Sequence, residues 1–363
     1  MPTPFQVVYV NRSRPVPVRA GLIQALHTAA AMQSLGLVVR MYLPPWPGSQ
    51  PLGARIAEFG VREIDVRTTT FLHHRWKRWG TYRPFLLAYR RVLARADAVY
   101  TRWPDLSIAL ANAGIQNSLE IHNTQELVKR GELKPLIEHH RRGGIRWLIP
   151  TLHAAANFLS EAGADPARIC VAPNGADLDA FADLPPIDPR RLERPRILYT
   201  GTLEAARGMN ILATIAERDV AHVTLVGDQK QNLPAVPGLD TRPRVPHRQV
   251  PELYREAELV LLPYQRQLVH VDSVCPVKLF EAMAAGRPII ASDIPTIREL
   301  VEHMKTAILV DPDDTESWIN AVELLKRDRD LALRLATEAR KRAPQFTWRR
   351  RAQTIAQTLG WLN

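Results

Sequence analysis

The sequence predicts an α/β protein with two domains, each built around a parallel sheet. The chain has 363 residues, more than a single hydrophobic core usually serves. Short apolar segments alternate with segments of helical periodicity in both halves, and strands separated by helices favour parallel sheets with right-handed crossovers. Residues 182–195, which are rich in proline and charge, separate the two halves and form the expected linker.

The first half contains several expected strands and one clear helix. In residues 21–36 leucine, alanine and methionine recur at helical spacing, and Gly36 provides a stop signal. The expected strands of this half are 5–10, 38–43, 98–100, 118–121 and 169–172.

The second half repeats the alternation more regularly. The expected strands are 196–200, 222–226, 259–262, 288–291 and 307–310. The expected helices are 209–218, 250–257, 277–285, 294–303 and 315–328. The last segment, 348–362, has apolar residues on one side and is expected to form an amphipathic helix.

Composition limits the classes of partner and compartment. The net charge is +11, with 48 Lys and Arg against 37 Asp and Glu, which favours nucleic acid, a membrane surface or phosphorylated substrates without choosing among them. No run of about eighteen apolar residues is present, so no transmembrane helix is expected. No secretory signal is recognised, and we expect a cytoplasmic protein. Cys170 and Cys275 match no metal spacing and are expected to be free thiols, with a disulfide between them as the alternative.

The most informative segment is 272–293, which begins after a predicted strand and therefore at the carboxyl end of a sheet, where ligands of open α/β sheets bind. Pro276 suits the first turn of the next helix, and Lys278 and Glu281 then share one face. The N–H groups of residues 274–277 are expected to bind phosphate oxygens. Lys278 would neutralise a departing diphosphate, and Glu281 would accept hydrogen bonds from two ribose hydroxyls.

This segment resembles the donor-site signature of glycosyltransferase family 4 and related GT-B enzymes, which runs roughly P-x-K-x-x-E-x-x-A-x-G-x-P. The matching residues are Pro276, Lys278, Glu281, Ala284, Gly286 and Pro288. The resemblance implies a GT-B fold, in which two Rossmann-like domains face one another across a cleft and a C-terminal helix returns to the N-terminal domain. The expected domains are an acceptor-side domain (1–184), a nucleotide-sugar domain (185–345) and the terminal helix (346–363).

Other matches in the second half extend the expected donor site. The strand and glycine-rich turn around Gly201 resemble the start of the family's C-terminal domain. The family usually has a basic residue directly after this glycine, where this chain has Thr202. A second basic position is filled by Arg207, which we expect to bind the diphosphate. By the same resemblance the base lies near residues 244–247, so Arg244 and His247 are expected donor contacts.

The chain departs from the family pattern in the loop before the signature helix. Many members have a glutamate there that contacts the transferred sugar, and this chain has Ser273 beside Asp272. The sequence therefore does not name the sugar. The expected donor contacts in this segment are Ser273, Val274, Cys275, Pro276 and Val277.

The first half resembles the family more loosely. Residues 119–123 look like the segment where these enzymes carry an acidic residue and a histidine, which implies that His122 lies near donor sugar and acceptor and that Glu120 orients it. Gly21 opens the first helix and is expected on the acceptor side. Residues 171–181 resemble the Asn-Gly stretch near the domain boundary, with an architectural role.

Three segments, 71–79, 82–91 and 139–147, mix aromatic and basic residues. This composition predicts peripheral contact with an anionic membrane, on its inner face for a cytoplasmic protein. Binding of single-stranded nucleic acid and a solvated helix face remain the alternatives.

The resemblance implies a retaining glycosyltransferase that moves a sugar from a UDP- or GDP-sugar to a glycan, lipid-linked or small-molecule acceptor, in envelope glycan or glycolipid synthesis. The expected catalytic residues are His122, Lys278 and Arg207. Because these cations and helix N-termini neutralise the leaving group, neither a metal nor another cofactor is expected. The alternatives are a GT-B sugar-nucleotide epimerase or phosphorylase, or a non-catalytic nucleic-acid-binding protein. A dehydrogenase is disfavoured because no Gly-x-Gly-x-x-Gly follows the first strand.

Overall fold

The computed structural model describes residues 4–13, 20–61, 64–73 and 82–362, and the chain divides into two compact units. The first unit comprises residues 1–174 and 348–363, and the second comprises residues 175–347. The expected boundaries after residues 184 and 345 differ from this division. Ala176 already pairs with Thr347 in an isolated parallel bridge, and the ring of Phe181 lies 5.5 Å from that of Tyr254, so residues 175–184 pack with the second unit.

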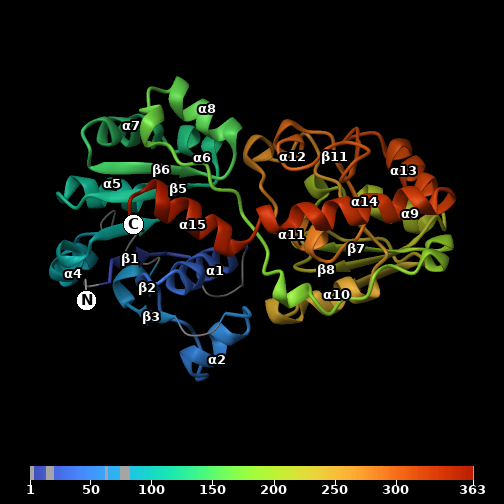
Figure 1. Cartoon of the computed structure of the whole chain (residues 1–363), viewed down its shortest axis with the longest axis horizontal. Helices are drawn as coiled ribbons and strands as arrows, with labels where there is room; N and C mark the ends of the chain where they lie inside the picture. Colours follow the sequence, from blue (N-terminus) through green and yellow to red (C-terminus); the bar gives the residue numbers. More distant parts are fainter. Residues whose placement is uncertain (1–3, 14–19, 62–63, 74–81, 363) are drawn as a thin grey trace. The chain divides into compact units, whose positions relative to one another are not determined.

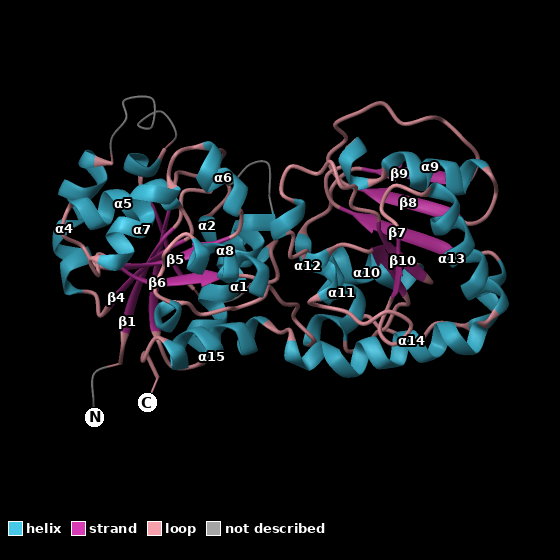
Figure 2. Ribbon diagram, turned by 90° about the horizontal axis from the view of Figure 1, so that it is seen from above, coloured by secondary structure: helices cyan, strands magenta, loops and turns pink. Residues whose placement is uncertain are grey.

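Each unit contains a six-stranded sheet whose neighbouring strands are all parallel (Figures 1 and 2). The first sheet consists of β1 (Gln6–Val10), β2 (Val38–Leu43), β3 (Asp65–Thr68), β4 (Ala98–Thr101), β5 (Asn117–Ile121) and β6 (Ile145–Pro150). The second consists of β7 (Arg196–Thr200), β8 (His222–Val226), β9 (Leu239–Arg242), β10 (Leu259–Leu262), β11 (Ile289–Ser292) and β12 (Ile308–Val310).

The strand orders are β3-β2-β1-β4-β5-β6 and β12-β11-β10-β7-β8-β9, so both sheets have the Rossmann order, the second counted from β7. The predicted α/β class with two Rossmann-like domains is confirmed.

Helices connect the strands in both units (Figure 1). The described helices of the first unit are α1 (Ala20–Ser34), α2 (Leu52–Ala57), α4 (Arg83–Arg95), α5 (Pro104–Asn112), α6 (Thr124–Lys129), α7 (Leu133–Arg141), α8 (His153–Glu161) and α15 (Trp348–Thr358). Those of the second are α9 (Met209–Glu217), α10 (Val250–Glu256), α11 (Val277–Ala284), α12 (Pro295–Arg298), α13 (Thr315–Arg327) and α14 (Arg329–Arg342). Short 3-10 turns include η5 (Ala205–Arg207) and η7 (Val271–Ser273).

Strands β3, β6 and β9 are not among the strands expected from the sequence. The first and last of these are edge strands with polar residues, which lack the apolar pattern of a buried strand. β6 was taken for part of an aromatic and basic surface segment. Residues 169–172, expected as a strand, are held beside β6 by hydrogen bonds from the amides of Cys170 and Ala172 to the carbonyl oxygens of Leu148 and Pro150, both 2.9 Å, but form only an isolated bridge.

The C-terminal helix α15 belongs to the first unit, as the expected fold requires, and packs against α1 (Figure 1). The ring of Trp348 stacks on that of His27 with centroids 5.4 Å apart. The apolar side of the helix is buried, at Ala352, Ile355 and Ala356. This packing carries one buried charge, Arg351, into the interior of the first unit.

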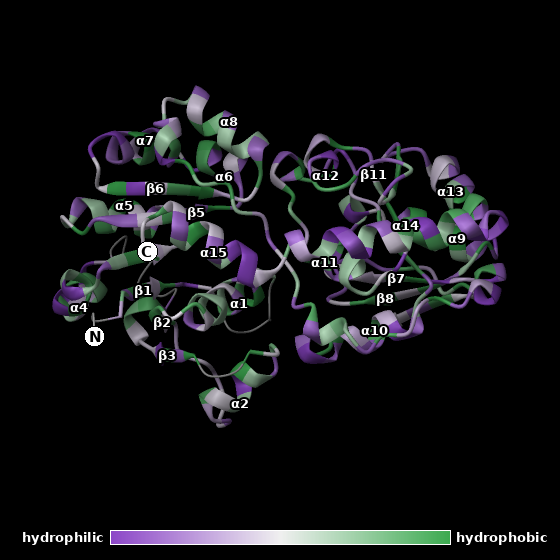
Figure 3. Ribbon diagram, viewed as in Figure 1, coloured by the Kyte–Doolittle hydropathy of each residue, from purple (hydrophilic) through white to green (hydrophobic). Residues whose placement is uncertain are grey.

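Helix α4 has two contrasting faces, and Figure 3 shows hydrophilic and hydrophobic residues along it. Phe85 and Leu93 are buried, whereas Leu87 is 76% exposed beside exposed Arg90 and Arg91. In the part of the chain that the structure describes, no helix is both long and apolar enough to cross a membrane. Residues 74–79 of the expected aromatic and basic segment lie outside the described residues. His140 of another such segment is buried and contacts the Ile145 carbonyl oxygen at 2.9 Å, so it does not contribute to a surface patch.

Candidate functional site

In the second unit, β7 and β10 are neighbours at the point where the strand order reverses. Ligands of open α/β sheets bind outside the carboxyl ends of the strands at this point. The loops that follow the two strands pack closely through Gly208, which has a φ of +70°. A Cβ at this position would lie 2.3 Å from the carbonyl oxygen of Pro263. Glycine is therefore required for the two loops to meet beside the expected diphosphate site.

Lys278, near the start of α11, places its ammonium group in this region. The Nζ is buried without a hydrogen-bond partner among the described residues. It lies 3.7 Å from the centroid of the Tyr199 ring and 5.8 Å from that of Tyr264. Burial, and then the charge of Arg207, hold the pKa of Lys278 well below its usual value, although Glu281 opposes them. A buried cation without a hydrogen-bond acceptor favours an anionic ligand.

Arg207 lies beside Lys278, at the end of η5. Its guanidinium is over the Tyr264 ring, 5.7 Å from the centroid, and its Nε donates to Glu204 at 2.6 Å. Burial lowers the pKa of Arg207, but Tyr264, Tyr199 and Glu204 outweigh it and raise the pKa above its ordinary value. Arg207 thus remains charged, and the structure brings the two expected diphosphate-binding cations together.

Gly201 and Thr202 lie in the turn directly after β7. Gly201 has a φ of +133°, and a Cβ there would lie 2.7 Å from the Nζ of Lys278. The Tyr199 hydroxyl donates to the carbonyl oxygen of Thr202 at 3.2 Å. The absence of a side chain at Gly201 therefore leaves room for Lys278. The bond to the Thr202 carbonyl oxygen holds Tyr199, whose ring Lys278 contacts.

Glu281, one turn along α11 from Lys278, is buried and has two polar neighbours. His247 Nε2 contacts one oxygen at 2.8 Å, and the Tyr254 hydroxyl donates to the other at 3.3 Å. These contacts hold the carboxylate in place, and a ribose hydroxyl would add to them or replace His247. Arg244 is engaged separately in a two-bond ion pair with Asp228, with distances of 3.2 and 2.7 Å.

The loop before α11 only partly matches the expected phosphate cradle. Ser273 is buried with its hydroxyl 3.4 Å from the His270 carbonyl oxygen, and the Val274 amide donates to Val271 at 3.5 Å. Pro276 has no N–H group and lies at the N-cap position, just before the first turn in which it was expected, and its side chain makes no capping hydrogen bond. The first-turn amides of Val277 and Lys278 have no acceptor within the helix, so they remain available to a ligand. Cys275 is a half-buried free thiol and Cys170 a buried one.

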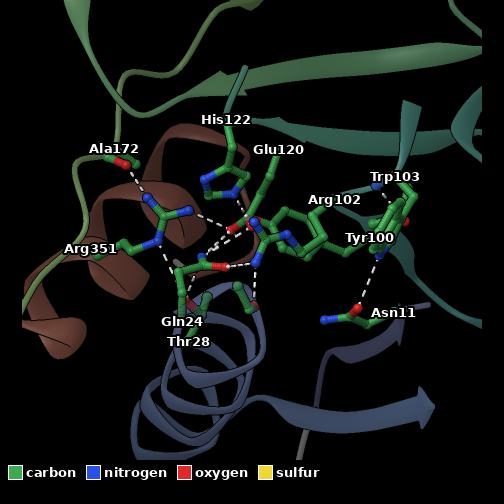
Figure 4. Close-up of polar contacts among 12 residues, drawn as sticks. Asn11, Gln24, Thr28, Tyr100, Arg102, Trp103, Glu120, His122, Ala172 and Arg351 are labelled. Carbon is green, nitrogen blue, oxygen red and sulfur yellow. Dashed lines mark hydrogen bonds and ion pairs between the residues drawn. The ribbon is translucent and has the colours of Figure 1, made fainter. Parts of the chain in front are cut away.

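In the first unit, Glu120 is the centre of a buried polar network (Figure 4). Its carboxylate accepts hydrogen bonds from the hydroxyls of Tyr100 and Tyr9, at 2.5 and 3.4 Å, and from the Gln24 amide at 3.1 Å. Arg351 of α15 forms an ion pair with it. Burial raises the pKa of Glu120, but Arg351 and His122 outweigh burial and hold it well below its usual range, so the carboxylate is ionised.

His122 lies two residues after Glu120, just beyond the end of β5, and its Nε2 is 3.1 Å from the Glu120 carboxylate. An ionised carboxylate only accepts hydrogen bonds, so Nε2 carries the proton and Nδ1 keeps its lone pair. Burial and the charge of Arg102 lower the pKa of His122 to about 4, although Glu120 opposes them. The imidazole is therefore neutral near pH 7 and fixed in one tautomer.

A cavity of about 930 Å³ in the first unit is lined by Gly21, Arg102, Trp103, Glu120 and His122, with other residues. The Arg102 guanidinium donates to the Gly21 carbonyl oxygen and to Gln24 Oε1, the latter at 3.1 Å. A Cβ on Gly21 would lie 2.6 Å from Arg102 Nη1. The absence of a side chain at Gly21 therefore leaves room for the Arg102 guanidinium beside the start of α1.

Aromatic and basic side chains line another part of this cavity. The Arg12 guanidinium stacks on the Trp103 ring, 4.5 Å from its centroid, and forms an ion pair with Asp105 at 2.8 Å. Trp103 Nε1 donates to Asn11 Oδ1 at 3.0 Å (Figure 4), and Trp46 also lines the cavity. Flat aromatic faces beside hydrogen-bonding groups suit the apolar faces and hydroxyls of a sugar or polyol.

Sequence reasoning missed Tyr199, Tyr264 and Arg351. Both tyrosines adjoin predicted strand ends of the donor region, and this placement was the available signal. Arg351 gave no such signal, because it is one of three consecutive arginines in a helix that was predicted from its apolar residues alone. Among the residues described here, no group of three or more His, Cys, Asp and Glu side chains is placed to hold a metal ion.

Comparison with known proteins gives three findings. The model of the family described as Glycosyl transferases group 1 matches residues 194–328. The D-inositol 3-phosphate glycosyltransferase of Xylanimonas cellulosilytica is 27% identical over 224 residues, 54% of this chain and 52% of the relative. That of Rhodococcus opacus is 27% identical over 292 residues, covering 71% and 62% of the two chains. The chain thus spans about half to three fifths of the length of these curated relatives.

Solved structures match over nearly the whole chain. Anabaena HepE in complex with UDP has a TM-score of 0.73 at 18% identity and covers 99% of this chain and 100% of its own. Sucrose-phosphate synthase from Thermosynechococcus elongatus has a TM-score of 0.74 at 17% identity, with 98% coverage of both chains. These likenesses confirm the two-domain GT-B fold, and together with the family match they confirm the resemblance to GT-B glycosyltransferases.

Proposed function

We propose that this chain is a glycosyltransferase that moves a sugar from a nucleotide diphosphate donor to an acceptor bound by the first unit. The observation that carries the proposal is the buried Lys278 ammonium, which has no hydrogen-bond partner among the described residues and lies beside Arg207 where the strand order reverses. An anionic diphosphate would supply the missing acceptors. The family match over residues 194–328 supports this assignment.

The chemistry expected of these cations is stabilisation of the leaving group. In transfer, the bond between the anomeric carbon and the β-phosphate oxygen breaks and its electron pair leaves with the diphosphate. The acceptor hydroxyl oxygen forms the new bond to the anomeric carbon, and its proton passes to the departing phosphate oxygen. Charges that are already in place stabilise such a leaving group without reorganisation. Lys278, Arg207 and the first-turn amides of α11 would supply this charge, and we therefore propose transfer without a metal ion.

UDP-sugars are the donors we propose first. Among the structural relatives, HepE was solved with UDP and with UDP-glucose, and Glu281 is placed to accept hydrogen bonds from ribose hydroxyls. Glu281→Gln keeps the shape of the side chain but replaces one acceptor oxygen by a donor. We expect this variant to bind UDP more weakly and to lose most of the wild-type preference for UDP over 2′,3′-dideoxy-UDP in calorimetry. An unchanged preference would remove Glu281 from the ribose site.

The acceptor side of the proposal rests on the cavity of the first unit, with His122 in its wall. The curated relatives are named for D-inositol 3-phosphate, and two structural relatives are lipopolysaccharide glycosyltransferases. We therefore propose a hydroxyl-bearing acceptor of the polyol phosphate or envelope glycan type. Retention of the anomeric configuration is proposed from the sequence resemblance.

Peripheral membrane contact is proposed through the exposed face of α4. An exposed Leu87 among arginines suits an anionic bilayer, because the apolar side chain enters the interface while the cations meet the headgroups. Sedimentation with phosphatidylglycerol vesicles, compared with phosphatidylcholine vesicles, tests this contact. Leu87→Glu should weaken it, and equal binding by both proteins would contradict it.

Transfer is tested by incubating the protein with UDP-, GDP- and ADP-sugars in EDTA, with myo-inositol phosphates and lipid-linked glycans as acceptors. Mass spectrometry then follows the nucleotide, the intact donor and the product. The proposal expects one donor to release its nucleoside diphosphate together with a glycosylated product. NMR of the new anomeric centre establishes the stereochemistry. Isomerised donor without transfer would instead indicate an epimerase.

Measuring UDP binding tests the donor site even when the true acceptor is not among those tried. UDP should bind wild-type protein and bind Lys278→Ala much more weakly, with or without an acceptor present. Salt-sensitive binding of single-stranded RNA that survives Lys278→Ala, without any nucleotide binding, would support the nucleic-acid alternative and overturn the proposal.

A further inference from the structure

Arg351 reaches the interior of the first unit from the helix nearest the C-terminus. Its side chain is only 1% exposed. The guanidinium donates to Glu120 and to the Ala172 carbonyl oxygen, with further contacts to the Pro173 carbonyl oxygen at 3.2 Å and Thr28 Oγ1 at 3.3 Å (Figure 4). Each of its nitrogens thus has an acceptor, and three segments distant in the sequence are tied to α15.

Arg351 is one of several groups around the Glu120 carboxylate. The Glu120 carboxylate contacts Tyr9 of β1, Tyr100 of β4, Gln24 of α1, His122 after β5 and Arg351 of α15. Burial, with the charge of Glu120, raises the pKa of both tyrosines well above the usual value, so they are neutral donors. Arg102, directly after β4, acts on this cluster through its charge, while its bonds go to Gly21 and Gln24.

Among the described residues, Arg351 and His122 are therefore the two groups in contact with Glu120 that can carry positive charge. Because Arg351 is permanently charged, the carboxylate is already paired, and the imidazole can remain neutral while it donates Nε2–H. Without the arginine, the buried carboxylate would be left with the histidine as its adjacent cation, and protonation of His122 would become more favourable.

We propose that Arg351 is a positioning residue that pairs with the other oxygen of the Glu120 carboxylate and so, together with Arg102, keeps His122 a neutral, Nε2-protonated imidazole in the wall of the acceptor cavity. In this arrangement the packing of α15 into the first unit sets the protonation state of His122. The inference rests on the proposed function only for the role of His122 in transfer, since the protonation state itself can be measured without a substrate.

The test is a titration of the histidine imidazoles by long-range nitrogen–carbon correlation NMR on the full chain. Eleven histidines are present, and the His122 signals are identified by their loss in His122→Gln. In wild-type protein, His122 should remain neutral and Nε2-protonated from pH 5.5 to 8. In Arg351→Met its titration midpoint should rise by at least one pH unit, which is a tenfold change in proton affinity.

Arg349→Met is the matched control, because it removes a charge from the exposed side of the same helix. It should leave the His122 titration unchanged. Equal titration of His122 in wild type and in folded Arg351→Met would overturn the inference, and so would an equal shift in Arg349→Met.

Arg351→Met could fail to fold, because it leaves a buried carboxylate without its strongest partner. The double variant Glu120→Gln, Arg351→Met removes both charges and avoids this cost. It should fold and keep the His122 midpoint low, whereas a raised midpoint in the double variant would show that Glu120 is not the link and would also overturn the inference. If no sugar transfer is found but these titrations behave as stated, the proposed function fails and the role of Arg351 stands.

Discussion

The Nζ of Lys278 lies 3.7 Å from the centre of the Tyr199 ring, and in the described part of the chain it has no hydrogen-bond partner. The Tyr199 hydroxyl in turn is held by the Thr202 carbonyl oxygen. An aromatic face attracts a cation without satisfying its N–H donors. The pair therefore fixes the position of the ammonium group and leaves its hydrogen bonds for a ligand.

Lys278→Met should weaken UDP binding by about 10- to 100-fold, because a hydrogen bond to a charged group contributes about 1.5–3 kcal/mol. Since the substitution removes a buried cation without a hydrogen-bond partner, the melting temperature should not fall. Calorimetric titration with UDP and a thermal melt measure the two effects. Lys305→Met, at a lysine that is 61% exposed and paired with Glu302, is the control, and equal loss of affinity in both variants would contradict the assignment.

The Tyr199 ring should matter more for donor binding than its hydroxyl. Tyr199→Phe keeps the aromatic face and loses the contacts of the hydroxyl with the Thr202 carbonyl oxygen and with Arg207, so UDP affinity should stay within about threefold of wild type. Tyr199→Leu loses the cation–π contact, which is worth about 0.5–2 kcal/mol, so affinity should fall by about 2- to 30-fold. If the two variants bound UDP equally, the aromatic face would have no part in placing Lys278.

His122 should make the stability of the first unit depend on pH between about 4 and 6.5. Its folded-state pKa of about 4 lies below the unfolded value of about 6.5. The unfolded state therefore binds more protons in this window, and stability is full above pH 6.5 and is lost as the pH falls towards 4. The loss attributable to His122 is at most about 3 kcal/mol.

Urea unfolding of wild type and His122→Gln at pH 7 and pH 5 measures this difference. The variant should lose less stability than wild type on acidification, because glutamine does not titrate. A parallel loss in both proteins would mean that other groups, such as carboxylates, account for the whole effect.

Gly208→Ala should destabilise the second unit more than a glycine substitution with similar backbone strain. Gly208 and Gly238 have φ of +70° and +82°, so alanine is strained at either position. At Gly208 the new Cβ would also meet the Pro263 carbonyl oxygen at 2.3 Å, whereas at Gly238 its nearest neighbour lies at 3.7 Å. Gly238→Ala should cost about 1 kcal/mol and Gly208→Ala clearly more.

Thermal unfolding of the two variants measures this difference, and UDP binding reports on the site. Gly208→Ala should also weaken UDP binding, because Arg207 precedes the displaced loop. Equal melting temperatures for both variants would show that the two loops can separate at little cost.

Local sequence signals predicted most of the central strands and the helices between them. The spacing of Pro276, Lys278 and Glu281 places two of them one turn apart on α11, which is a property of a single helix. Edge strands β3 and β9 were missed, since their residues are partly exposed and carry no apolar pattern. Of the expected helix 294–303, only Pro295–Arg298 forms α12, and further along Met304 adopts a φ of +58° within a hydrogen-bonded turn of residues 302–307.

The sequence alone therefore determined the α/β class and the two domains, and it predicts the region of the donor site, since periodicity and motif spacing act over a few residues. The tertiary structure decided which charges are buried and what they meet. Lys278 rests on Tyr199 across 79 positions of chain, and Arg351 pairs with Glu120 across 231. Burial and a charged partner together set the protonation of a side chain, and both depend on which distant segments pack against it.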